Sequence, residues 1–277
     1  MFLRKNLLKN SIRRLSSQLQ PGIKIKNWQV KETAKIQEFQ LTASRLEHKS
    51  GGQLLHVQRA DPNATFSVGF RTTPENSTGL PHILEHTVLC GSERFPCRDP
   101  FFNMLNRSLA TFMNAMTAPD HTFYPFSSQN AQDCRNLQSV YLDAVFKPRL
   151  CQEDFRQEGW RLEHEDPHDP SSPIVLKGVV FNEMKGVFSD NQSLYSEALL
   201  NGILPSNTYG VCSGGLPKDI PKLKHKDLVK FHERHYTAAN ARFYVYGNLP
   251  IEEYLEAMEP YLTNKGLVNY FITFSNC

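Results

Sequence analysis

The sequence predicts an α+β fold in which an antiparallel β-sheet carries helices on one face. Three observations support this class. Short segments rich in β-branched and alternating apolar residues, which are typical of strands, come early in the chain. Longer segments with a helical apolar period follow them, and one more strand-like segment comes late. Strands that precede a run of helices, instead of alternating with them, favour an α+β arrangement.

The expected strands are short and are bounded by turn residues. Two of them are expected to flank a turn at Pro119 and Asp120. The strand-like segments comprise residues 51–60, 64–73, 110–128 and 241–248.

The expected helices each have an apolar face. The first, at residues 79–90, has Ser77 or Thr78 as a candidate cap and tolerates Pro81 in its first turn. Two loops separate the later helices: a Pro-rich loop at 166–173 and a Gly/Pro-rich loop at 211–222. One further helix is expected before the second loop. The other helical segments comprise residues 130–148, 151–165, 174–190 and 225–236.

The composition is that of a globular protein, since 40% of the 277 residues are hydrophobic and 21% are charged. No apolar run approaches the roughly 18 residues that a membrane span needs, so no membrane span is expected. The six cysteines have no CxxC spacing and no secretory signal precedes them, which argues against a disulfide framework.

Residues 1–30 have the character of a mitochondrial transit peptide. The segment 1–31 carries eight Lys/Arg and no acidic residue, and its leucines and isoleucines recur at roughly helical spacing. The alternative is a disordered basic arm that binds nucleic acid or anionic lipid. No aromatic-rich basic patch follows the segment, so we expect no nucleic-acid partner and a protein of the mitochondrial matrix.

The folded domain is therefore expected to span residues 31–262. Without residues 1–31 the chain holds 23 Lys/Arg against 28 Asp/Glu, a net charge of −5. Residues 263–277 have no clear amphipathic period, and we expect them to form an unpatterned C-terminal tail.

The stretch GLPHILEHTVLC, residues 79–90, carries the strongest chemical signal. At 100° per residue His82, Glu85 and His86 fall on one side of the helix and the apolar residues on the other. Histidines four residues apart suit two bonds to one Zn²⁺. Glu85 neighbours both, and it is placed to take a proton from the attacking water instead of binding the metal. The order H-x-x-E-H is that of the inverted zincins, although a polar helix face with a Glu–His pair is the alternative.

A catalytic zinc needs a third protein ligand, and Glu183 is the candidate. In the helix expected at 174–190, Glu183 lies three residues after Val180 and four before Val187, on the apolar face. An ionised carboxylate on a buried face is costly unless it is paired or bound to a metal. The alternative is a glutamate at the boundary of the face or one paired with an arginine.

Three blocks of the chain resemble the pitrilysin-type inverted-zincin metallopeptidases. They are GLPHILEHTVLCGSERFP, NAMTAPDHTFYPF and VVFNEMKG, and the resemblance extends over residues 35–250. The gap from His82 to Glu183 is 101 residues, about twenty more than in the processing-peptidase and insulin-degrading branches. Those branches usually have a second glutamate seven residues before the third ligand, where this chain has Leu176. Both departures favour the branch that degrades presequences.

The resemblance implies a pitrilysin-like domain that binds zinc through His82, His86 and Glu183, with Glu85 as the general base. It implies hydrolysis of short unstructured peptides, including cleaved presequences and amyloid-β-like peptides. Asn114 and Ala115 match the strand that pairs with the substrate backbone. Many presequences are basic, which suits the acidic charge of residues 32–277.

Family members are several times longer than this chain, and two halves enclose their catalytic chamber. The resemblance therefore implies that the chain corresponds to an N-terminal portion, whose partner would be the missing C-terminal half. One alternative is a truncated, non-catalytic form that binds peptides or pairs with another subunit. Another is an unstable fragment with an exposed interface.

Overall fold

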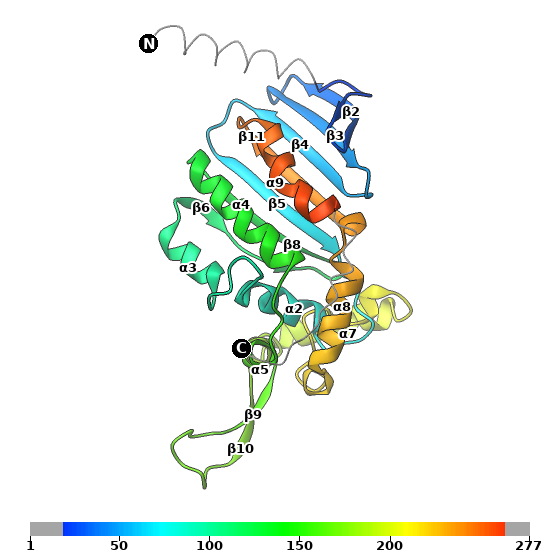
Figure 1. Ribbon diagram of the computed structural model, residues 1–277. Helices are drawn as coiled ribbons and strands as arrows, with labels where there is room; N and C mark the ends of the chain where they lie inside the picture. The colour runs from blue at the N-terminus through cyan, green and yellow to red at the C-terminus, as the bar shows by residue number, and fades with distance from the viewer. Residues whose placement is uncertain (1–18, 264–277) are drawn as a thin grey trace.

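A nine-stranded, mostly antiparallel sheet forms the centre of the computed structural model, which describes residues 19–263 (Figure 1). The strand order is β1-β2-β3-β4-β11-β5-β8-β6, with β7 paired to β8. The pair β4–β11 is parallel and the others are antiparallel. The strands are β1 (Lys24–Ile25), β2 (Trp28–Ile36), β3 (Leu41–His48), β4 (Gln53–Arg59), β5 (Ala64–Arg71), β6 (Ala110–Met113), β7 (Met116–Thr117), β8 (His121–Ser128) and β11 (Ala241–Gly247).

Two helices, α4 (Ala131–Phe146) and α9 (Ile251–Thr263), cover one face of this sheet (Figure 1). The side chain of Asn130 caps α4 by accepting hydrogen bonds from the next turn. Aromatic rings fill the space between the layers, where Tyr254 of α9 stacks on Phe66 of β5 with ring centroids 6.2 Å apart. The predicted α+β class with helices on one face is confirmed.

The remaining helices gather below one end of the sheet, around α2 (Figure 1). They are α2 (Leu80–Thr87), α3 (Pro100–Arg107), α5 (Gln152–Glu158), α6 (Val179–Val187), α7 (Asn191–Ile203) and α8 (His225–His235), with short 3-10 turns at Val88–Cys90, Thr208–Gly210, Ile220–Lys222 and Ala238–Asn240. Between residues 19 and 263, no helix combines the length and the apolar character that crossing a bilayer demands.

A separate hairpin of β9 (Arg161–His164) and β10 (Ile174–Lys177) projects from the domain (Figure 1). It corrects two predictions, because residues 151–165 and 174–190 were each expected as one helix. Two glycines explain the difference. A Cβ at Gly178 would lie 2.1 Å from the carbonyl oxygen of Gly159, so the two backbones cross in contact at the base of the hairpin. Each predicted helix is interrupted at its glycine.

The sheet begins earlier than the domain boundary predicted at residue 31. Trp28 and Val30 of β2 are each 1% exposed and belong to the core. The transit peptide predicted for residues 1–30 therefore overlaps the first strands, and residues 1–18 lie outside the described part of the chain. The predicted tail also lies outside it, except for Thr263, which ends α9.

Candidate metal centre

The N-cap of α2 is Gly79, which precedes the first helical residue, Leu80. Gly79 has a φ of 71°, in the left-handed region that favours glycine, and no side chain caps the helix. The predicted cap at Ser77 or Thr78 is wrong, whereas Pro81 does lie in the first turn. Ser77 is instead tied to the loop after α7: its carbonyl accepts from the backbone N–H of Leu216 at 2.8 Å.

Three glycines bring that loop against the start of α2. A Cβ at Gly79 would lie 2.7 Å from the carbonyl oxygen of Gly214, and one at Gly215 would lie 2.7 Å from Cα of Gly79. Side chains at these positions would separate the two segments. The contact matters because it holds the Gly214 carbonyl beside the first histidine of the motif.

The helix α2 has an apolar side and a polar side, as predicted, and both sides are largely inaccessible to solvent. Ile83, Leu84 and Val88 are fully buried in the core. On the polar side His82 is 9% exposed and Glu85 is 6% exposed. The motif therefore lies in a site largely shielded from water, where charges interact more strongly than at the surface.

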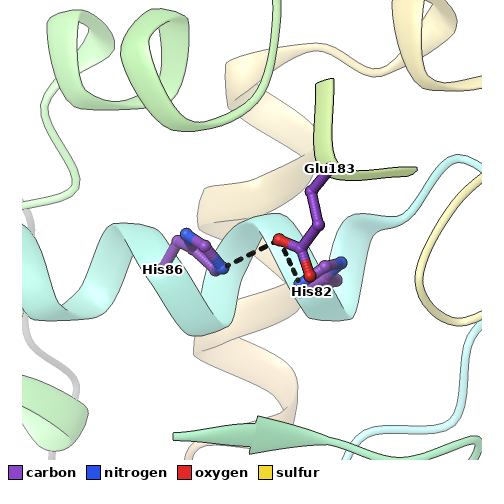
Figure 2. Close-up of side chains that lie close together, drawn as sticks. All are labelled: His82, His86 and Glu183. Carbon is purple, nitrogen blue, oxygen red and sulfur yellow. Dashed lines mark ion pairs between the residues drawn. The ribbon is translucent and has the colours of Figure 1, made fainter. Parts of the chain in front are cut away.

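Glu183 of α6 meets both histidines of α2 (Figure 2). Its Oε2 lies 3.6 Å from Nε2 of His82 and 3.9 Å from Nε2 of His86. One ligand atom from each residue lies within 4.8 Å of the others, and no other set in residues 19–263 places three His, Cys, Asp or Glu side chains in this way. Ligands of a tetrahedral zinc are roughly 3.3 Å apart, so the two nitrogens and one carboxylate oxygen are the right donor set for this ion and would have to move closer together to hold it.

Glu183 lies beside the two histidines, but the prediction that it lies on a buried helix face is wrong. Its side chain is 48% exposed, and Val187 is also exposed. Because α6 begins at Val179 and not near residue 174, its buried face consists of Val180, Phe181 and Met184. Glu183 lies beside that face and points to α2.

Each histidine is oriented by a partner on its other ring nitrogen. Nδ1 of His82 lies 3.2 Å from the carbonyl oxygen of Gly214, and Nδ1 of His86 lies 3.0 Å from Oε2 of Glu158. Both acceptors require a proton on Nδ1, so in the neutral imidazole Nε2 is unprotonated, and it is directed toward Glu183. This is the tautomer that metal binding through Nε2 requires.

Acidic neighbours determine the protonation of His86. Burial lowers the pKa of its imidazole, but the hydrogen bond to Glu158 and the charges of Glu85, Glu158 and Glu183 outweigh burial and raise it. Burial likewise raises the pKa of the Glu158 carboxyl, but the hydrogen bonds from His86 and Gln157 outweigh it and lower the pKa. Glu158 could not have been identified from the sequence, because it lies at no motif spacing from His86.

Glu85 is held separately from the three converging groups. The hydroxyl of Thr117, in β7, donates to Oε2 of Glu85 at 2.6 Å, and it lies 3.5 Å from the hydroxyl of the buried Thr122. One carboxylate oxygen of Glu85 is thus engaged from the sheet. Thr117 lies within the block NAMTAPDHTFYPF, but sequence analysis did not identify it as a site residue.

Asn114 and Ala115 lie at the edge of the sheet, between β6 and β7. The backbone N–H of Asn114 donates to the carbonyl of Pro125 at 3.1 Å, which extends the pairing with β8. The strand β6 ends the strand order, so its outer edge has no neighbouring strand among residues 19–263. An added peptide strand could pair at such an edge.

Comparison with known proteins finds similarity to peptidases. Residues 60–173 match the family described as Insulinase (Peptidase family M16), and residues 222–269 match the Peptidase M16 inactive domain. The chain is similar to proteins named "Presequence protease, mitochondrial": it is 63% identical to that of Danio rerio over 239 residues and 57% identical to that of Mus musculus over 240. Each alignment covers 86% of this chain and 23% of the relative, so the chain spans about a quarter of their length.

Two solved structures share the fold. The crystal structure of pitrilysin matches with a TM-score of 0.66 and 21% identity, over 86% of this chain and 24% of that one. A protease from Helicobacter pylori matches with a TM-score of 0.65 and 18% identity, over 80% of this chain and 50% of that one. At these identities the likeness extends to the fold alone.

Proposed function

The chain belongs to the M16 family of peptidases, and on that premise we propose that it is a zinc metalloendopeptidase of the mitochondrial matrix. One observation carries the proposal: Nε2 of His82, Nε2 of His86 and Oε2 of Glu183 converge on one point, with Glu85 on the same helix face. Two imidazoles and one carboxylate leave a fourth position open, as hydrolytic zinc sites do.

His82, His86 and Glu183 would hold the zinc ion. When bound, zinc would polarise the scissile carbonyl and lower the pKa of an adjacent water toward ~7. Glu85 takes the proton of that water and delivers it to the leaving amine. Thr117 engages Oε2 of Glu85, which keeps Oε1 available for the proton. Because Glu85 is 6% exposed, bulk water does not compete strongly for its carboxylate.

The substrates proposed are short unstructured peptides, including cleaved presequences and amyloid-β-like peptides. The relatives' name supports presequences, and the net charge of −5 over residues 32–277 would favour basic peptides. We further propose that Asn114 and Ala115 pair with the peptide backbone as an added strand. The matrix location rests on the basic segment 1–30 and on relatives named mitochondrial.

A second candidate is a non-catalytic form that binds peptides or pairs with a further subunit, such as the C-terminal half of longer relatives. The helix α7 favours it, since none of its residues is buried and it exposes Tyr195, Leu199 and Ile203 along one stripe. This candidate requires zinc or peptide binding without turnover.

Metal analysis and one cleavage assay on the purified chain test the proposal. The wild type should contain equimolar zinc and cleave a quenched basic peptide, and a chelator should remove both properties. Glu85→Gln should keep the zinc and lose cleavage, because an amide cannot accept the proton. Normal turnover by that variant would refute the role of Glu85, and zinc or peptide binding without turnover by the wild type would support the second candidate.

A further inference from the structure

Glu158 occupies a position that is unfavourable for a carboxylate. It is the last residue of α5, where the helix dipole is negative, and it is only 7% exposed. Burial and the dipole both disfavour its charged form. Its Oε1 accepts from the side-chain amide of Gln157 at 2.9 Å and its Oε2 accepts from Nδ1 of His86 at 3.0 Å, so both oxygens are used.

The contact between α5 and α2 sets the distance from Glu158 to His86. Gly159 follows Glu158 immediately, and a Cβ at Gly159 would lie 3.2 Å from Cγ2 of Ile83. Ile83 precedes His86 by three residues, hence by about one helical turn. Close approach at Gly159 therefore brings the end of α5 against the middle of α2, beside the second histidine.

The two histidines receive supports of different strength. His82 faces a neutral backbone carbonyl at 3.2 Å, whereas His86 faces an ionised carboxylate at 3.0 Å. A hydrogen bond to a charged acceptor is about twice as strong as one to a neutral acceptor. A carboxylate on Nδ1 also makes Nε2 a better electron donor. His86 is thus the histidine whose orientation and basicity depend on a side chain.

We propose that Glu158 is a positioning residue of the metal centre, which fixes the Nδ1–H tautomer of His86 and strengthens its Nε2 as a ligand. The inference rests on the proposed function, because it takes zinc as the ion that His82, His86 and Glu183 hold. Its effect on metal affinity is measured separately from the contribution that the hydrogen bond between His86 and Glu158 makes to the stability of the fold.

Zinc affinity, measured by competition with a chelator, tests the proposal without reference to turnover. Glu158→Met removes the acceptor at similar size and should weaken zinc binding by about 10- to 100-fold. Glu158→Gln retains an acceptor oxygen without the charge and should lose less than Glu158→Met. Asp154→Asn, on the same helix α5, is the matched control and should bind zinc as the wild type does.

Two further measurements distinguish positioning from a structural role. In the zinc-free protein near pH ~9, where imidazoles are neutral, ¹⁵N spectra should assign Nδ1–H to His86 in the wild type and a mixture of tautomers in Glu158→Met. The thermal midpoint of zinc-free Glu158→Met shows whether the variant is folded where zinc is titrated; it should fall modestly, because Nδ1–H of His86 and the side-chain amide of Gln157 lose their acceptor. An unchanged Nδ1–H tautomer of His86 in folded Glu158→Met would overturn the proposal.

The outcomes separate this inference from the proposed function. If the wild type binds zinc without cleaving peptide, and Glu158→Met binds zinc weakly, the peptidase proposal fails and the role of Glu158 stands. If folded Glu158→Met binds zinc as tightly as the wild type, the role of Glu158 fails whatever the turnover. A wild type that does not bind zinc overturns both.

Discussion

Two regions of this protein, the core at β4 and the metal centre at α2, hold histidines whose pKa values are shifted in opposite directions. His56 of β4 is 3% exposed, neither of its ring nitrogens has a hydrogen-bond partner among residues 19–263, and burial lowers its pKa to about 4. The side chain of His86 is 25% exposed; its partial burial lowers its pKa, but the hydrogen bond to Glu158 and the charges of the neighbouring carboxylates outweigh burial and raise it. The comparison teaches that carboxylate neighbours can outweigh burial in setting the pKa of a histidine, whereas burial without such neighbours keeps it neutral.

The largest expected effect distinguishes the two regions by metal binding. His86→Leu removes one of three ligands and should lower zinc affinity by more than about 100-fold, beyond the loss expected for a supporting residue. His56→Leu is the matched change in the core and should leave zinc affinity unaltered. Zinc titration of both variants checks this, and equal affinities would abolish the distinction between the two regions.

Acid should destabilise the fold through the core histidine. Between pH 6.5 and about 4 the unfolded chain binds a proton at His56 that the folded protein does not, so the free energy of unfolding rises with pH and falls on acidification. The contribution of His56 lost at pH 5 relative to pH 7.5 is about 2 kcal/mol.

Urea unfolding of the zinc-free wild type and of His56→Leu, at both pH values, isolates this contribution. The difference in unfolding free energy between the two proteins should shift by about 2 kcal/mol in favour of the variant at pH 5. At pH 7.5 the variant should be at least as stable, because leucine removes two buried nitrogens without partners. A difference independent of pH would show that His56 is not buried in its neutral form.

The sequence identified one of these two regions and not the other. The H-x-x-E-H spacing needs only one helix, so His82, Glu85 and His86 could be located without knowledge of the tertiary fold. His56 carries no such spacing, and its burial depends on β3 and β11, which flank β4. The strands β2 and β3 were missed for a related reason: their many polar residues weaken the alternation that predicts strands.

The supports of the metal centre were beyond prediction because they come from distant segments. Gly214 lies 132 residues from His82, and Glu158 lies 72 residues from His86. The Gly/Pro-rich loop that contains Gly214 was predicted only as a connection. Contacts between segments so far apart are set by packing at glycines, such as Gly79 against Gly214, which no periodicity in the chain records.

The smallest effect concerns how Glu85 is held within the metal centre. Thr117→Val replaces the hydroxyl that donates to Oε2 of Glu85 with a methyl group of similar size. A hydrogen bond to a charged group contributes about 1.5–3 kcal/mol, of which a part is replaced by rotation of the freed carboxylate. We therefore expect kcat to fall by roughly 10-fold, which corresponds to about 1.4 kcal/mol, with KM and zinc affinity little changed.

Thr117→Ser restores the donor and should recover most of kcat. If Thr117→Val also lowered zinc affinity, Thr117 would support the metal ligands as well as Glu85. The claim that the general base and the metal ligands have independent supports would then be wrong.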